Sequence, residues 1–123
     1  MADREHKNVN QDRRENNRID AYDVGLRVSN SIDGESLGII GNLSSCGMML
    51  ITRRQLFADG ILQLTIDLPR EMNAAPIPIG VKILWCTPAN SPDEFWVGLR
   101  TIDISQAGQA SLERLLEQLA NTV

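Results

Sequence analysis

The chain has 123 residues, of which 42% are hydrophobic and 23% charged, and its formal net charge is −4. This composition is ordinary for one globular domain, and it excludes collagen-like, low-complexity and membrane-spanning proteins. The acidic balance also argues against a basic surface that binds long nucleic acids. The basic residues are uneven, however, because ten are Arg and two are Lys, and four of the ten Arg lie in the first eighteen positions.

The N-terminal segment and the cysteines predict a cytoplasmic protein with a flexible arm. The sequence starts without the apolar stretch of a signal peptide, and Cys46 and Cys86 are expected as free thiols. Residues 2–18 are polar almost throughout, so they bury too little surface to offset their chain entropy. We therefore expect an arm over residues 1–18 in front of a folded domain of residues 19–123.

Alternation of apolar and polar residues predicts six short antiparallel strands after the arm. It begins at Tyr22, and Asp-Gly pairs at residues 33–34 and 59–60 mark turns. Six strands in about eighty residues favour closure into a small barrel, since closure removes exposed strand edges. The expected strands cover residues 22–28, 37–43, 48–51, 62–68, 77–85 and 94–102.

The same alternation predicts which side chains of these strands face the core. Leu37, Ile39, Gly41 and Leu43 fall on one face of the second strand. In the fifth strand, Trp85 falls on the face of Ile83 and is expected in the core, or at the mouth of the barrel if it also contacts a ligand.

A helix is predicted at the C-terminal end. Ser105 is a suitable N-cap, and Leu112, Leu115, Leu116 and Leu119 follow the 3.6-residue period of an amphipathic helix. This leucine stripe is expected to pack on the barrel or on another protein. The predicted fold class is therefore all-β with one C-terminal helix, in the form of a six-stranded antiparallel β-barrel.

Residues for catalysis are scarce. The only histidine, His6, lies in the arm, where nothing would hold it in a catalytic geometry. No Cys or His cluster has zinc spacing, and no Gly-rich phosphate loop joins a strand to a helix. We therefore expect a protein that is not an enzyme and needs no metal or cofactor.

Two short motifs suggest a ligand instead. Arg14 and Arg18 form R-x-x-x-R, and Asn42, Ser44 and Gly47 form N-x-S-x-x-G between the second and third strands. In their order and spacing, these motifs resemble the signature of the PilZ family of bacterial cyclic di-GMP receptors. That family's fold, a six-stranded barrel with a C-terminal helix, also matches the predicted elements, so the resemblance spans nearly the whole chain after residue 12.

A second copy of the N-x-S-x-x-G pattern, with Asp in place of Asn, occurs at Asp103, Ser105 and Gly108. It spans the junction between the last strand and the helix. We assign its polar residues to capping of the helix, and we expect the copy at residue 42 to be the ligand motif.

The resemblance implies a role for each motif residue. Each guanine of cyclic di-GMP presents an O6/N7 acceptor pair that Arg binds with two hydrogen bonds, so Arg14 and Arg18 would clamp the ligand. Asn42 would meet a guanine edge, and Ser44 would bond a phosphate or a base. Gly47 would permit a positive φ or a close backbone approach to the ligand.

Three further residues complete the predicted site and surface. The resemblance implies that Trp85 stacks on guanine, and that Arg13 accompanies capture of an intercalated ligand dimer, with two ligands per chain. Trp96 lies on the opposite strand face from the core residues and would be available to a partner.

The sequence therefore predicts a cyclic di-GMP receptor or adaptor that folds its arm over the bound ligand and presents the new surface to an effector protein, which the sequence does not identify. The alternative is a ligand-independent protein–protein interaction module that uses the leucine helix or the face of Trp96. A barrel that binds single-stranded RNA is disfavoured by the net charge of −4 and by only five aromatic residues.

Overall fold

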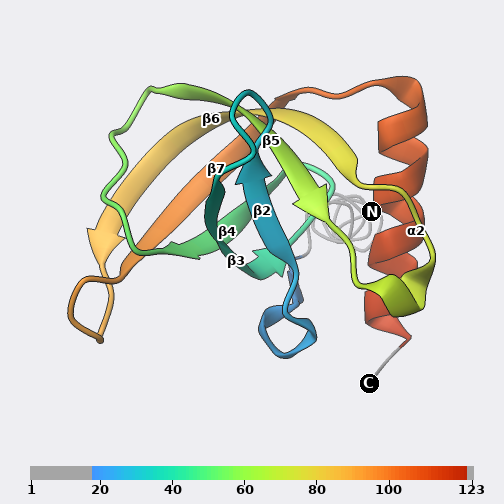
Figure 1. Cartoon of the computed structure of the whole chain (residues 1–123), viewed down its shortest axis with the longest axis horizontal. Helices are drawn as coiled ribbons and strands as arrows, with labels where there is room; N and C mark the ends of the chain where they lie inside the picture. The colour runs from blue at the N-terminus through green and yellow to red at the C-terminus, as the bar shows by residue number, and fades with distance from the viewer. Residues whose placement is uncertain (1–17, 122–123) are drawn as a thin grey trace, which may run out of the picture.

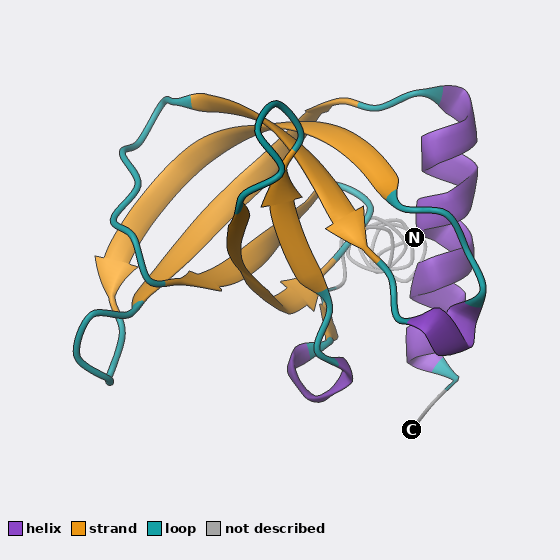
Figure 2. Ribbon diagram, in the orientation of Figure 1, coloured by secondary structure: helices purple, strands orange, loops and turns teal. Residues whose placement is uncertain are grey.

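The computed structural model describes residues 18–121, so residues 1–17 of the expected arm, with His6, Arg13 and Arg14, lie outside the described residues, whereas Arg18 lies within them. Within them, a strongly curved sheet is flanked by one long helix (Figures 1 and 2). The elements are β1 (Ile19–Asp20), η1 (Tyr22–Val24), β2 (Arg27–Asn30), β3 (Ser36–Leu43), β4 (Gly47–Thr52), β5 (Ile61–Asp67), η2 (Arg70–Met72), β6 (Ile77–Pro88), β7 (Phe95–Asp103) and α2 (Gln106–Ala120).

The six longer strands close into an antiparallel barrel, as the sequence predicts. The strand order is β1-β3-β2-β5-β6-β7-β4, and an additional β3–β4 pairing closes the sheet. The two-residue β1 pairs with the end of β3, beyond the part of β3 that pairs with β2, with Ile19 opposite Leu43 and Asp20 opposite Asn42. Closure leaves no long strand with an unpaired edge among the six.

The helix α2 packs on the barrel through the predicted leucine stripe. Leu112, Leu115 and Leu119 are buried, and Leu116 is partly buried against the same core. The helix stands at one side of the barrel (Figure 1), and it contacts β6 and β1. The side chain of Ser105 accepts a hydrogen bond of 2.9 Å from the backbone N–H of Gly108, which confirms that this second copy of the motif caps the helix.

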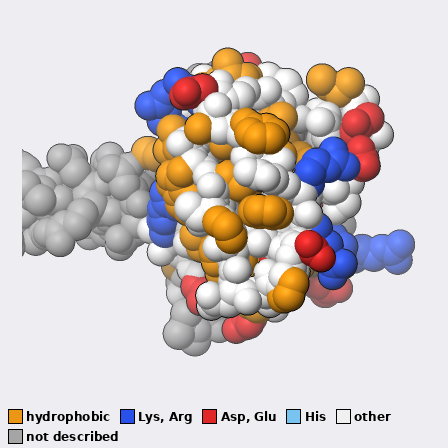
Figure 3. Space-filling view, turned by 90° about the vertical axis from the view of Figure 1, so that its left-hand side faces the viewer, with side chains coloured by type: hydrophobic (Ala, Val, Ile, Leu, Met, Phe, Trp, Pro, Cys, Tyr) orange, Lys and Arg blue, Asp and Glu red, His pale blue; other side chains and the backbone are white. Residues whose placement is uncertain are grey.

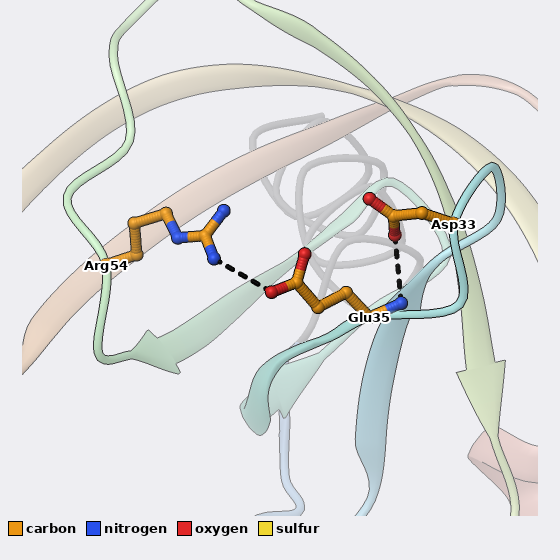
Figure 4. A network of polar contacts seen from close by, with 3 residues as sticks. All are labelled: Asp33, Glu35 and Arg54. Atoms are coloured by element: carbon orange, nitrogen blue, oxygen red, sulfur yellow. Dashed lines mark hydrogen bonds and ion pairs between the residues drawn. The ribbon is translucent and has the colours of Figure 1, made fainter.

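The predicted turn between the first two long strands is also present. Gly34 has a φ of 75°, a left-handed conformation that favours glycine, and its N–H bonds the carbonyl of Asn30. Asp33 accepts a hydrogen bond from the N–H of Glu35, and Glu35 pairs with Arg54 at 3.1 Å (Figure 4). Both charged side chains are largely exposed, so the pair contributes little to stability, but it gives Arg54 an acidic partner.

The expected strand from residue 22 to 28 is wrong in its first half. Tyr22–Val24 form a 3-10 turn that ends at Gly25, which has a φ of 75°. The strand begins only at Arg27, and Tyr22 is 56% exposed. The alternation of residue types was real, but the turn places the tyrosine outside the barrel.

The expected face of the second strand is wrong for its first part. Ile40 and Leu43 are both fully buried although they are three residues apart. A β-bulge at Gly41 makes this possible, because pairing with β4 steps from Ile40 to Asn42. Leu37 and Ile39, which were predicted to share the face of Leu43, lie half-buried on the outside of the barrel.

A bulge in β6 likewise overturns the core position expected for Trp85. Ile83 pairs with Leu99 and faces the core, whereas the next pair is Trp85 with Gly98. Leu84 is the extra residue, and it shifts the following side chains by one. Trp85 consequently points out of the barrel and is 38% exposed.

Candidate ligand-binding site

The two bulges bring motif residues from distant strands into one row on the outer face of the barrel. Asn42 on β3 pairs with Met49 on β4, Met49 pairs with Gly98 on β7, and Gly98 pairs with Trp85 on β6. Residues paired in this way on one face of a sheet are direct neighbours. The row therefore joins the predicted asparagine and the predicted tryptophan across four strands.

Arg18 joins this row at the end formed by Asn42. Its guanidinium donates a hydrogen bond of 3.2 Å to the side-chain oxygen of Asn42. The position is set by β1, because the residue after Arg18 pairs with β3, and by the backbone bond of 3.0 Å from Ala21 to Gly41. The two predicted motifs, 24 residues apart in the sequence, thus meet through their side chains.

Ser44 is directed into the loop that follows β3. The side chain is buried, with 3% exposure, and its hydroxyl accepts hydrogen bonds of 3.2 Å from the N–H groups of Cys46 and Gly47. It also lies 3.3 Å from the carbonyl oxygen of Gly47, to which it donates. Ser44 therefore fixes the shape of the loop over residues 44–47.

Gly47 allows two strands to approach closely. Its φ is not positive, and a β-carbon at this position would collide with the carbonyl oxygen of Leu99 on β7. The neighbouring carbonyl of Cys46 accepts a bond of 2.8 Å from the N–H of Thr101. The positive φ expected for Gly47 is absent, and the close approach in the structure is to the backbone of β7. A close approach of this glycine to the ligand stays a prediction.

The indole ring of Trp85 packs directly on Gly98. A β-carbon at Gly98 would collide with the indole ring, so the ring rests directly over the β7 backbone. Figure 3 shows the side of the molecule where β6 ends and β7 begins. Hydrophobic side chains gather in the middle of this surface, and charged side chains lie toward its rim. Trp85 thus has the exposed, supported ring that base stacking requires.

A cavity of about 470 Å³ is lined in part by Arg18. Its walls combine aromatic rings with amide and carboxylate groups, which suits a flat heterocycle with polar edges. Half-buried Trp96 contributes to it, so the prediction that Trp96 would be freely exposed is only partly correct. The main lining residues are Arg18, Asp20, Tyr22, Asn42, Met49 and Trp96.

Arg18 also lines a smaller cavity of about 160 Å³. It contains the loop that Ser44 organises and a second arginine, Arg100, which sequence reasoning did not assign to the site. Only its outward position on the last strand could have pointed to it. The main lining residues are Arg18, Ser44, Cys46, Gly47, Leu84 and Arg100.

The described residues form neither a candidate metal site nor a candidate membrane-spanning helix. Residues 18–121 contain no group of three His, Cys, Asp or Glu side chains placed to hold a metal ion. Within the same range, no helix combines the length and the apolar character needed to cross a bilayer.

Comparison with known proteins decides the family. Residues 12–118 match the PilZ domain family. The chain belongs to the PilZ domain family. A search of curated proteins gave no match, so more specific comparisons come from solved structures of PilZ proteins.

These structures share the fold at low sequence identity. The Bacillus subtilis inhibitor of motility MotI/DgrA superposes with a TM-score of 0.67 at 20% identity, over 86% of this chain and 50% of that one. YcgR from Escherichia coli, in complex with c-di-GMP, gives 0.66 at 15% identity, over 85% of this chain and 44% of that one. This PilZ chain thus spans about half the length of these two proteins. The isolated PilZ domain of YcgR with c-di-GMP gives 0.57 at 15% identity, over 86% and 95%.

Proposed function

We propose that this PilZ chain is a cytoplasmic receptor for cyclic di-GMP, without catalytic activity, and that the ligand binds on the outer row that runs from Asn42 to Trp85. The observation that carries the proposal is the hydrogen bond between Arg18 and Asn42, because it brings the two sequence motifs into contact. Arg18 also lines two cavities, which gives the ligand space beside this contact. The ligand in the YcgR complexes supports the assignment of the ligand class.

The chemistry of the row suits this ligand. Arg18 can donate two hydrogen bonds to the O6/N7 edge of a guanine, and Asn42 beside it offers both a donor and an acceptor. Trp85, resting on Gly98, offers a ring face for stacking, worth ~1–3 kcal/mol per base. Ser44 acts indirectly, by holding the loop whose backbone lines the smaller cavity.

Arg13 and Arg14 extend the proposal beyond the described residues. We propose that both bind the ligand together with Arg18, and that ordering the arm over the barrel would cost ~2–5 kcal/mol of the interaction energy. A third guanidinium would suit an intercalated ligand dimer, which carries four negative charges. Two ligands per chain are therefore expected.

An effector protein would bind the surface made by arm, ligand and barrel. A groove of about 400 Å³ on the outside of the barrel favours the alternative of a ligand-independent protein-binding module as a second candidate. It is lined by Leu37 and Ile39, which the bulge in β3 places outside the core, and by Ile51 of β4. The neighbouring cavity of about 310 Å³ shares Tyr22 and Trp96 with the ligand cavity, so a bound ligand and a bound partner would share walls.

Isothermal titration calorimetry with the full chain tests the proposed function. Cyclic di-GMP should bind saturably with a stoichiometry near two, because guanine offers the acceptor pair that arginine binds. Cyclic di-AMP has the same backbone and charge but presents a donor and an acceptor at that edge, so it should bind at least about tenfold more weakly.

The outcomes separate the parts of the proposal. Equal binding of both dinucleotides would contradict guanine recognition. A stoichiometry of one, with Arg13 intact, would contradict the ligand dimer alone. No heat with either dinucleotide, combined with binding of a protein partner in their absence, would support the ligand-independent module instead.

A further inference from the structure

Arg100 is a cation without an acidic partner near the candidate site. It lies on β7 opposite Gly47 of β4 and Lys82 of β6, and its side chain is exposed. Lys82 lies 3.7 Å from Asp59, and Arg54 has its own carboxylate partner. The side chain of Arg100, by contrast, has neither an ion-pair nor a hydrogen-bond partner within residues 18–121.

The smaller cavity collects positive charge from two directions. Arg18 enters it from the strand β1 side and Arg100 from β7, while the residue between them, Gly47, has no side chain to separate them. No Asp or Glu lines this cavity. Two guanidinium groups at one cavity without a carboxylate form a site for an anion, because each attracts negative charge and neither is neutralised.

The larger cavity, unlike the smaller one, is unfavourable for an anion. Asp20 contributes a carboxylate to it, and Tyr22 and Trp96 contribute aromatic surface. A carboxylate repels phosphate but accepts hydrogen bonds from donors such as those on the guanine N1 and N2 edge. The two cavities thus differ in the part of a nucleotide that each would accept.

We propose that Arg18 and Arg100 form a phosphate subsite, which holds a phosphodiester group of the cyclic dinucleotide while a guanine occupies the larger cavity. The subsite rests on the proposed function, since it divides that ligand between two cavities. It is built on rigid backbone, because Thr101 N–H bonds the carbonyl of Cys46 at 2.8 Å and ties the loop to the strand that carries Arg100.

The test compares Arg100→Gln with the full-length parent chain by calorimetric titration of cyclic di-GMP at several NaCl concentrations. We expect about tenfold weaker binding, the effect of one charge-assisted hydrogen bond at an exposed position. The affinity of the variant should also depend less steeply on salt, because one screened charge has been removed. Arg100→Lys, which keeps the charge but loses the planar fork, should give an intermediate affinity.

Arg114→Gln is the matched control, since Arg114 is exposed on α2 and the substitution removes the same charge. It should leave affinity unchanged, and both variants should keep the parent melting temperature. Unchanged affinity in Arg100→Gln, beside a parent chain that binds, would overturn the subsite and leave the proposed function standing. Weaker binding with an unchanged salt dependence would overturn the assignment to phosphate, whereas a parent chain that does not bind would overturn the proposed function itself.

Discussion

Arg18→Ala is expected to weaken cyclic di-GMP binding by about 100-fold or more. Arg18 is the only described residue that lines both cavities, and it donates to Asn42. The substitution removes the guanidinium from guanine and phosphate at once, and charge-assisted hydrogen bonds contribute about 1.5–3 kcal/mol each. Calorimetric titration, with competition by a tighter-binding ligand analogue if the heat is small, measures the loss.

Two variants make the result for Arg18 specific. Arg70→Ala removes an exposed arginine of η2, away from both cavities, and should not change the affinity. Arg18→Lys keeps the charge without the two-pronged geometry, so it should recover only part of the binding. Parent-like affinity in Arg18→Ala, with the barrel folded by circular dichroism, would contradict the proposed site.

Gly47→Ala is expected to destabilise the barrel by about 1–3 kcal/mol, the usual cost of overpacking in a closely packed region. The added β-carbon would collide with the carbonyl oxygen of Leu99, which is a backbone atom of the β4–β7 ladder and has no rotamer to change. For a domain of this size, the melting temperature should fall by roughly 5–15 °C.

Thermal denaturation without ligand distinguishes a structural role of Gly47 from a ligand contact. Cys46→Ala changes the neighbouring exposed residue of the same loop, and its melting temperature should stay within a few degrees of the parent. If Gly47→Ala kept full stability and lost only ligand binding, the close approach of β4 and β7 would not be the reason for this glycine.

The sequence alone supports the prediction of the fold because the signals for it are local. The helix from Gln106 to Ala120 follows from a leucine period and a cap at Ser105, and both are present. The strand count follows from alternation and turn residues. The error at Tyr22 has a local cause as well, since Gly25 permits a turn with positive φ that the alternation pattern conceals.

The site could be predicted less completely, because its geometry depends on register. A bulge arises from the pairing of two strands, so a count of alternating residues along one strand cannot detect it. For this reason alternation places Trp85 on the core face or at the barrel mouth, although it points out of the barrel. It likewise places Leu37 and Ile39 on the face of Leu43, although they line an outer groove. Arg100 was missed because it belongs to no motif, and only the pairing of β4 with β7 places it beside Gly47.

The most direct measurement is a titration of isotope-labelled chain with cyclic di-GMP, followed by two-dimensional NMR. The central claim is that the ligand lies on the outer row and in the cavities beside Arg18. It predicts large shifts for the backbone amides of Asn42, Cys46 and Gly98 and for the indole N–H of Trp85, with the amides of α2 little changed. Shifts confined to α2 or to the groove of Leu37 and Ile39, or no shifts at saturating ligand, would contradict it.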